Sequence, residues 1–193
     1  ITEKLPVKIE LYQKLGQLCN DISIVMANTS CISITRLASY TRYPENVVGG
    51  HFMNPVSSIQ AVELIRGFHS TDCVIEKVRK LIRSIGKKSI LIDDFPGFVS
   101  NRISHLMINE AAFVLQDGVA DVKDIDEIFK QCYGHKMGPL ETSDLIGIDT
   151  VVDSLDILFQ SYQDTKFRCC PLLRKMVDAG LKGVKTGKGF YQY

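Results

Sequence analysis

The chain has 193 residues, of which 45% are hydrophobic and 23% are charged, and these fractions exclude a disordered, collagen-like or coiled-coil protein. Its 23 Lys and Arg residues nearly balance its 22 Asp and Glu residues, so the charge predicts neither a nucleic-acid partner nor a membrane partner. Every apolar run is shorter than the ~18 residues of a membrane-spanning helix. The length suits one large domain or two small ones.

The first half of the chain alternates between predicted helices and strands. Apolar residues at near-helical spacing predict a helix over 3–19, and a short apolar run predicts a buried strand over 23–27. Further strands are predicted over 47–52, near 61–65 and over 89–92. Between the last two, Thr71 is the predicted N-cap of another helix and Gly86 its predicted end. This alternation is typical of an α/β layer.

Only helices are predicted after the Pro96-Gly97 pair, which interrupts the alternating pattern. The longest predicted helix covers 98–117 and ends at Gly118. Shorter helical elements are predicted over 122–133, from Gly138-Pro139 onward, over 150–162 and over 171–179. We therefore expect a boundary near 95–97, with an α/β domain in residues 1–96 and an all-helical domain in residues 97–193.

Six cysteines are scattered along the chain without a C-x-x-C pair: Cys19, Cys31, Cys73, Cys132, Cys169 and Cys170. This pattern predicts reduced thiols and a reducing compartment. It does not favour a metal site, because ligand spacing is missing around them. The chain begins at Ile1 rather than at Met, directly before the predicted helix over 3–19, which suggests that its beginning has been lost.

Two polar residues stand on neighbouring predicted strands. His51 ends the strand over 47–52, and Glu63 lies within the next one. If the strands pair, the Glu63 carboxylate accepts a hydrogen bond from one imidazole nitrogen and fixes the tautomer, which leaves the other nitrogen to act as a general base. Spacing alone fits equally well a histidine bonded to the backbone and a glutamate that faces water.

Other polar residues follow predicted strands or begin predicted helices. Asn28-Thr29-Ser30 comes after the strand over 23–27, where ligands bind in α/β sheets, but spacing alone favours a turn that caps the next helix. Asn101 fits a helix cap as well as a donor to a substrate carbonyl. The remaining histidines are predicted to be surface or hydrogen-bonded residues: His69, His105 and His135.

The sequence lacks both common glycine-rich phosphate-binding signatures, G-x-G-x-x-G and G-x-x-x-x-G-K-[ST]. A nucleophilic pair of Ser30 and His51 is conceivable. No G-x-S-x-G elbow surrounds Ser30, however, so a hydrolase is not favoured.

Several motifs follow one another along essentially the whole chain. They are Ala27–Ser30, His51–Val56, Val62–Glu63, Pro96–Arg102, Asn109–Ala111, Asp124–Asp126, Met137–Pro139, Asp144–Asp149 and Gly187–Tyr191. In this order they resemble the L-3-hydroxyacyl-CoA dehydrogenase family, near its 3-hydroxybutyryl-CoA members. The fold implied by the resemblance is an α/β remnant of a Rossmann-type NAD-binding domain followed by an all-α C-terminal dimerisation domain.

The resemblance also implies an activity and roles for particular residues. The activity is the NAD-dependent interconversion of 3-hydroxyacyl-CoA and 3-ketoacyl-CoA. His51 resembles the base that takes the hydroxyl proton, with Glu63 as its orienting partner, while Ser30 and Asn101 resemble the residues that hold the substrate oxygens. The positions that resemble cofactor contacts are Glu3, Lys8, Ser30 and Asn54. The family pairs through its helical domain, so a homodimer is expected.

The chain departs from the family at several points. It starts after the glycine-rich pyrophosphate loop, the acidic ribose-binding residue and part of the CoA site. Ala27 stands where the family usually has serine, and Ser100 where a hydrophobic residue is usual. A Rossmann half without its first part exposes apolar sheet surface, so we expect the chain alone to dimerise, swap elements or aggregate, and to bind NAD weakly.

Two alternatives stay open. One is a non-catalytic helical oligomerisation module with the same fold, which the simultaneous presence of His51, Glu63, Ser30 and Asn101 disfavours. The other is a dehydrogenase of the same fold that oxidises a sugar acid. The expected compartment is a bacterial cytoplasm or a mitochondrial matrix, because both keep cysteines reduced.

Overall fold

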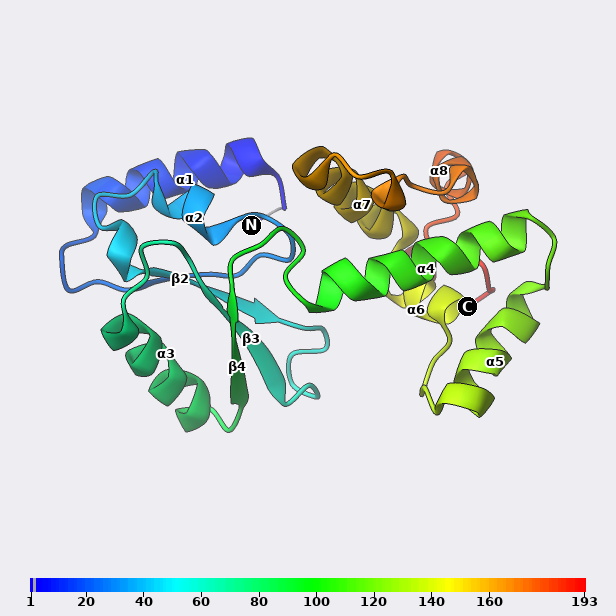
Figure 1. The fold of residues 1–193 in the computed structure, drawn as a ribbon, viewed down its shortest axis with the longest axis horizontal. Coiled ribbons are helices and arrows are strands. Elements are labelled where there is room, and N and C mark those ends of the chain that lie inside the picture. The colour runs from blue at the N-terminus through cyan, green and yellow to red at the C-terminus, as the bar shows by residue number, and fades with distance from the viewer. Residues whose placement is uncertain (2) are drawn as a thin grey trace. The chain divides into compact units, whose positions relative to one another are not determined.

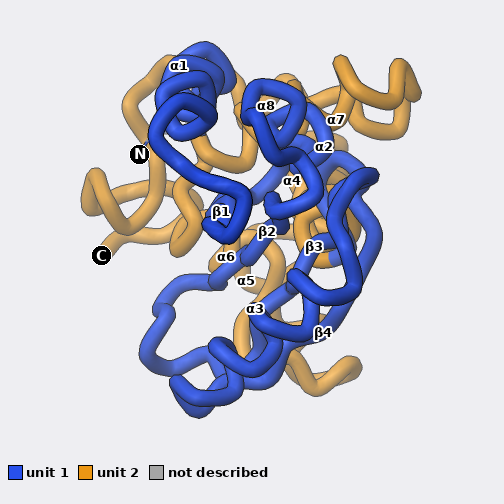
Figure 2. The backbone as a smooth tube through the Cα atoms, turned by 90° about the vertical axis from the view of Figure 1, so that its left-hand side faces the viewer, with its two compact units in different colours: residues 1–99 blue, residues 100–193 orange. Residues whose placement is uncertain are grey.

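The structure, a computed structural model, describes Ile1 and residues 3–193. It divides into two compact units, Ile1–Val99 and Ser100–Tyr193, coloured blue and orange in Figure 2. The first unit mixes strands and helices, and the second is built from helices, as Figure 1 shows.

A four-stranded sheet organises the first unit. Its strands are β1 (Val25–Ala27), β2 (Val47–Phe52), β3 (Ala61–Arg66) and β4 (Lys88–Asp93), and they lie in chain order. β1 and β2 run parallel, β2 and β3 antiparallel, and β3 and β4 parallel. The antiparallel register places His51 directly opposite Glu63, so their side chains emerge on the same face of the sheet.

Helices cover both faces of this sheet (Figure 1). They are α1 (Leu5–Leu18), α2 (Ile34–Ala38) and α3 (Asp72–Ser84). Val47 and Ile65 face a core shared with α1 and α2, whereas Val48 and Leu64 face a core shared with α3. Burial of both faces accounts for the nearly continuous apolar strands.

The helix signals in the sequence act largely as predicted. Thr71 caps α3 by accepting a hydrogen bond from the Val74 amide, and Gly86 follows that helix with a φ of 75°. The strand predicted over 23–27 is shorter, at Val25–Ala27. The helix α2 was not predicted from the sequence, because five residues are too few to show a helical period.

The first unit continues beyond the expected boundary near 95–97 and ends at Val99. Phe98 is buried and packs in the core beside α2, so the chain leaves this unit only after that residue. Phe98 also has a φ of 51°, which is incompatible with a helix. The helix predicted from residue 98 therefore begins at Ser100.

The second unit contains five α-helices among its described residues. They are α4 (Ser100–Gln116), α5 (Val122–Tyr133), α6 (Pro139–Ile146), α7 (Ile148–Tyr162) and α8 (Pro171–Asp178). Ile108, Leu155 and Leu173 join α4, α7 and α8 in one core. A smaller cluster of Ala111, Ile125 and Leu140 joins α4, α5 and α6.

Two fully buried aspartates hold the ends of elements in this unit. The Asp126 carboxylate accepts hydrogen bonds from the Leu140 and Glu141 amides at the start of α6, where a negative charge complements the helix dipole. The Asp144 carboxylate accepts hydrogen bonds from the Phe190 and Tyr191 amides. The C-terminal segment is thereby tied to α6.

Two searches of the described residues bear on function. Within residues 1 and 3–193, every helix is too short or too polar to cross a membrane. The same residues contain no group of three or more His, Cys, Asp and Glu side chains arranged to hold a metal ion.

Candidate active site

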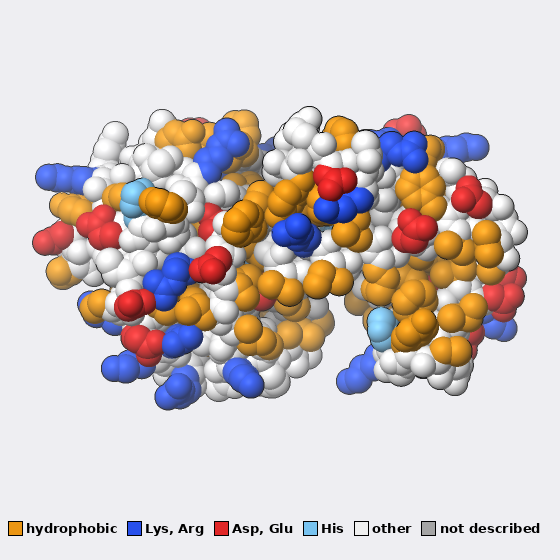
Figure 3. Space-filling view, in the orientation of Figure 1, with side chains coloured by type: hydrophobic (Ala, Val, Ile, Leu, Met, Phe, Trp, Pro, Cys, Tyr) orange, Lys and Arg blue, Asp and Glu red, His pale blue; other side chains and the backbone are white. Residues whose placement is uncertain are grey.

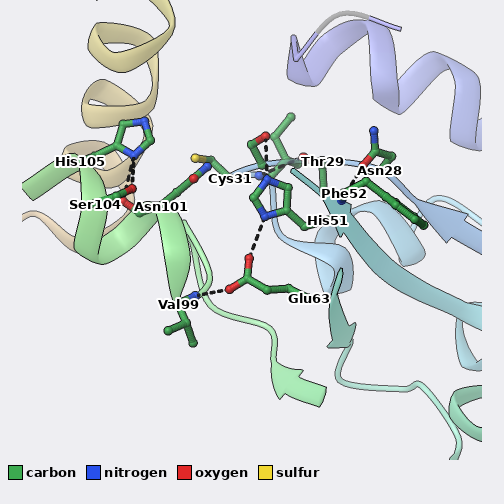
Figure 4. A network of polar contacts seen from close by, with 12 residues as sticks. Asn28, Thr29, Cys31, His51, Phe52, Glu63, Val99, Asn101, Ser104 and His105 are labelled. Atoms are coloured by element: carbon green, nitrogen blue, oxygen red, sulfur yellow. Dashed lines mark hydrogen bonds and ion pairs between the residues drawn. The ribbon is translucent and has the colours of Figure 1, made fainter. Parts of the chain in front are cut away.

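A buried histidine–glutamate pair lies at the end of β2. The Nδ1 atom of His51 is 2.7 Å from the Oε2 atom of Glu63, and each residue is only 6% exposed. Figure 4 shows the two side chains pointing toward each other from β2 and β3. Because a carboxylate oxygen only accepts hydrogen bonds, Nδ1 carries the proton and donates it, which leaves a lone pair on Nε2.

The second oxygen of Glu63 is also engaged. Its Oε1 atom accepts a hydrogen bond from the Val99 amide at 3.3 Å, which Figure 4 marks with a dashed line. The preceding residues form a turn in which the Phe98 amide donates to the Phe95 carbonyl, with Gly97 at a φ of 78°. Proline second and glycine third is the pattern of a type II turn.

The Phe98 ring forms a wall beside the pair. Its centroid lies 5.9 Å from that of the His51 ring, with the planes tilted by 50°. The φ of 51° at Phe98 is uncommon for a residue with a side chain. The turn thus places the Phe98 ring beside His51 and the Val99 amide beside Glu63.

Ser30 lies at the other imidazole nitrogen. The Ser30 Oγ atom is 3.3 Å from His51 Nε2. Ser30 follows β1, and His51 lies near the end of β2, which runs parallel to β1. Carboxyl ends of parallel neighbours form the edge at which α/β sheets bind ligands, so a hydroxyl donor and a proton acceptor meet at a binding edge.

Glu3, which lies just before α1, bonds the segment that carries Ser30. Glu3 Oε1 accepts hydrogen bonds from the Ser30 amide at 2.8 Å and from the Thr29 hydroxyl, and Glu3 Oε2 lies 3.2 Å from Lys8 Nζ. Burial raises the pKa of Glu3, but the hydrogen bonds from Thr29 and Ser30 and the charge of Lys8 outweigh it and hold the pKa below its usual value.

The other residues proposed from the sequence lie elsewhere. Asn54 is exposed, two residues after the end of β2. Asn101 is the second residue of α4, in the second unit, so it lies within the helix rather than at its cap. His105 is buried and its Nδ1 atom lies 3.0 Å from the Asn101 carbonyl oxygen, whereas His69 and His135 are exposed.

The sequence analysis missed two parts of this site, the Val99 amide and the Phe98 ring. The Pro96-Gly97 pair predicts a turn. The sequence does not show that the Val99 amide after this turn reaches Glu63, because that contact depends on the register of β2 and β3. The contacts of Glu3 and Lys8 with the segment around Ser30 were not predicted either, because the residues in contact are 20 or more positions apart along the chain.

The site fits one end of a dinucleotide. A hydroxyl beside an unprotonated imidazole nitrogen suits a reaction in which a substrate hydroxyl loses its proton next to a hydride acceptor. The described residues contain no glycine-rich loop for a pyrophosphate. The side chains of this site would meet the nicotinamide end of NAD, where hydride is exchanged.

Family models match nearly the entire chain. Residues 1–95 match "3-hydroxyacyl-CoA dehydrogenase, NAD binding domain", and residues 97–193 match "3-hydroxyacyl-CoA dehydrogenase, C-terminal domain". The expected fold class, a Rossmann-like NAD-binding domain followed by a helical domain, is confirmed by these matches and by the solved structure described below.

Similar proteins agree with the family models. A probable 3-hydroxybutyryl-CoA dehydrogenase of Bacillus subtilis is 43% identical over all of this chain, which covers 67% of that protein. One from Deinococcus radiodurans is 45% identical, with 69% of its length covered. The crystal structure of (S)-3-hydroxybutyryl-CoA dehydrogenase from Ralstonia eutropha superposes with a TM-score of 0.95 at 41% identity, over all of this chain and 68% of that one.

The chain thus spans about two thirds of the length of the relatives it matches. Both of its units are matched by models of one enzyme family, and the sequence resemblance to that family is confirmed. The chain belongs to the 3-hydroxyacyl-CoA dehydrogenase family.

Proposed function

We propose that the protein interconverts (S)-3-hydroxyacyl-CoA and 3-ketoacyl-CoA with NAD as the hydride acceptor or donor, and that His51 is the general base. One observation carries this proposal: the Glu63 carboxylate holds His51 Nδ1 at 2.7 Å, while the Ser30 hydroxyl lies 3.3 Å from Nε2. This is the arrangement of an oriented base next to a donor for a substrate oxygen.

In the oxidative direction, the 3-hydroxyl of the substrate gives its proton to His51 Nε2. The C–H bond at carbon 3 breaks at the same time, and its electron pair leaves with the hydrogen as hydride, so a carbonyl forms. NAD, when bound, accepts that hydride. Glu63 keeps the imidazole oriented and stabilises the imidazolium that forms, and the proton returns from Nε2 in the reductive direction.

Ser30 and Asn101 are proposed to hold the substrate oxygens. A hydroxyl and a side-chain amide both donate hydrogen bonds, which stabilise the negative charge that develops on the oxygen during hydride transfer. The position of Ser30 beside His51 Nε2 supports this role. For Asn101 the support is its match to the family motif Pro96–Arg102.

The proposed contacts with NAD are Glu3, Lys8, Ser30 and Asn54. Ser30 faces the binding edge of the sheet, and Asn54 is exposed close to the end of β2. Lys8 is buried and donates to the Asn28 carbonyl at 3.0 Å. Glu3 and Lys8 also bond the backbone of the segment that carries Ser30, so the four proposed contacts lie close together around that segment.

We further propose that the protein forms a homodimer through its helical unit. The outward face of α5 exposes Ile128 to 50% and Tyr133 to 70%, and Figure 3 shows hydrophobic side chains gathered over this helix. Exposed apolar residues of this kind mark interfaces. Light scattering on the complete protein should give twice the monomer mass. A monomer mass would contradict the dimer.

The proposed compartment is one that keeps thiols reduced, a bacterial cytoplasm or a mitochondrial matrix. All six cysteines are outside disulfide bonds, and three of them are buried. Such thiols suit reducing conditions.

A competition assay tests the proposed substrate. The complete protein is given NADH and acetoacetyl-CoA, and NADH consumption is followed with and without an excess of a keto form of a sugar acid. We expect turnover of acetoacetyl-CoA that the sugar acid does not inhibit. Turnover of the sugar acid alone would favour the alternative dehydrogenase. Absence of turnover with both substrates would favour the non-catalytic module.

A further inference from the structure

Asp94, the residue that follows β4, holds the start of α2. Its Oδ1 atom accepts a hydrogen bond from the Ile34 amide at 3.0 Å, and its Oδ2 atom accepts from the Thr35 amide at 2.7 Å and from the Ser33 hydroxyl at 2.8 Å. The Asp94 amide donates to the Arg66 carbonyl at 3.0 Å, which extends the ladder between β3 and β4. Asp94 thus connects the end of the sheet to the start of a helix.

This contact does more than an ordinary helix cap, because α2 already has one. Ser33 is the N-cap of α2 and accepts a hydrogen bond from the Arg36 amide. Asp94 adds a negative charge at the positive end of the helix dipole, and hydrogen bonds to a charged acceptor are roughly twice as strong as neutral ones. A helix of five residues is too short to hold its place by its own backbone bonds. Its position therefore depends on Asp94 and on packing.

Two chain segments that contact the histidine–glutamate pair meet at Asp94. The first leads into α2 and carries Ser30, whose Oγ atom lies 3.3 Å from His51 Nε2. The second leads away from Asp94 through the turn, and its Val99 amide donates to Glu63 Oε1 at 3.3 Å. The side chain of Asp94 is bonded to the first segment and its backbone begins the second. Asp94 therefore joins the groups that contact the two ends of the pair.

The Phe98 ring connects the second segment to α2 as well. It packs in one core with Ile34 and Leu37 of α2, and its centroid lies 5.9 Å from that of the His51 ring. Because protein cores are closely packed, a shift of α2 is transmitted to the side chains that touch it. Movement of α2 away from β4 would thus displace the ring beside His51.

We propose that Asp94 is a positioning residue that sets the distance between the Ser30 hydroxyl and the His51–Glu63 pair, by tying together the two segments that contact the pair. This role rests on the proposed function of Ser30 and His51. It differs from a purely structural role, because a structural residue is needed only for stability, whereas a positioning residue also sets the reaction rate of the folded protein.

The variant Asp94→Asn tests this role in the complete protein. The amide keeps the shape of the side chain, but it loses the charge and turns an N–H group toward the donors of α2. We expect kcat at saturating NADH and acetoacetyl-CoA to fall by at least about tenfold, since misplacement by about 1 Å can cost about a hundredfold in rate. The matched control is Asp93→Asn, because Asp93 is the neighbouring residue and is exposed. A kcat within about twofold of the unsubstituted protein would overturn the proposal.

A second control separates lost stability from lost positioning. Thr71 caps α3 by accepting a hydrogen bond from the Val74 amide, and α3 packs on the face of the sheet opposite to α2. Thr71→Ala therefore weakens the same unit at a helix start away from the pair. It should lower the melting temperature and leave kcat within about twofold. A loss of kcat in Thr71→Ala as large as that in Asp94→Asn would make Asp94 merely structural and overturn the proposal.

Two NMR signals report the positions of the tied segments without turnover. The ¹⁵N chemical shift of His51 Nε2 reports its contact with the Ser30 hydroxyl, and the amide signal of Val99 reports its hydrogen bond to Glu63. Asp94→Asn should move both signals, because both segments lose their common anchor. The two control variants should leave both signals in place.

The NMR signals also keep this proposal distinguishable from the proposed function. If the unsubstituted protein turns over neither candidate substrate, the proposed function fails, and the two signals still test the tie. Unchanged signals in Asp94→Asn would overturn the tie itself. If Asp94→Asn does not fold, Ser33→Ala is measured instead, because it removes one of the three donors to Asp94 and keeps the two amides. Unchanged signals in a folded Ser33→Ala protein would likewise overturn the proposal.

Discussion

At the scale of single residues, Glu63 determines what His51 can do. One carboxylate oxygen accepts from Nδ1 and the other from the Val99 amide, so both are satisfied although the side chain is buried. A buried carboxylate with two donors remains a good acceptor, and it fixes the imidazole in the tautomer whose Nε2 takes up a proton. Each partner of the pair thus provides a hydrogen-bonding partner for the other.

Glu63→Gln should therefore impair turnover strongly. The amide group has about the same size, but it carries no charge to stabilise the imidazolium and can present an N–H to Nδ1, which favours the wrong tautomer. We expect kcat to fall by about 10²–10⁴-fold, measured on a protein whose fold is verified by circular dichroism. The control is Glu76→Gln on the exposed face of α3, which should behave as the unsubstituted protein. A loss of less than about threefold would contradict the role of Glu63.

The cysteines should differ widely in reactivity. Burial raises the pKa of Cys169 to about 11, so at about pH 8 only about one thousandth of this thiol is the reactive thiolate. Cys73 and Cys132 are exposed. An aromatic disulfide reagent should modify these two rapidly and Cys169 only after unfolding, and the double variant Cys73→Ser/Cys132→Ser should lose the fast reaction. Peptide mapping that finds Cys169 modified in the folded protein would contradict this.

At the scale of elements, the antiparallel pairing of β2 and β3 creates the site. The sequence predicts both strands and the possibility that His51 meets Glu63, but period-2 patterns give no direct measure of register. Here both strands are buried on both faces, so a shift by one residue would leave an equally apolar strand. The observed pairing of His51 with Glu63 therefore required the structure.

The bounds of α3 could be predicted from local sequence signals, whereas the start of α4 could not. Thr71 and Gly86 delimit α3 through hydrogen-bonding and backbone rules that act within a few residues. In contrast, the positive φ of Phe98 allows its ring to pack in the core beside α2. The strain energy of this backbone conformation is offset by contacts with residues distant in sequence. For this reason α4 begins at Ser100 and not at residue 98, as the sequence predicted.

The buried Asp144 should be essential for the stability of the helical unit. Asp144→Asn keeps the shape of the side chain, but it replaces one acceptor oxygen by a donor that faces the amides of Phe190 and Tyr191. Hydrogen bonds to charged groups contribute about 1.5–3 kcal/mol each, so we expect the free energy of unfolding to fall by about 2 kcal/mol. The exposed Asp178→Asn on α8 is the control. Equal denaturation midpoints for the two variants would contradict this role.

At the scale of the whole molecule, the two units hold different groups of the residues with proposed roles. The first unit holds the histidine–glutamate pair and the residues around Ser30. The second holds Asn101 and the exposed face of α5. The sequence predicted an α/β part followed by a helical part, because the change from alternating to purely helical signals at Pro96-Gly97 is visible locally. The roles of individual residues and the dimer remain predictions.

The most direct test of the account is the turnover of His51→Gln in the complete protein. NADH formation from (S)-3-hydroxybutyryl-CoA is compared between the unsubstituted protein, His51→Gln and the exposed control His69→Gln, with circular dichroism to verify the fold. We expect His51→Gln to lose about 10²–10⁴-fold in kcat, whereas His69→Gln keeps full activity. Undiminished activity of a folded His51→Gln protein would contradict the assignment of His51 as the base.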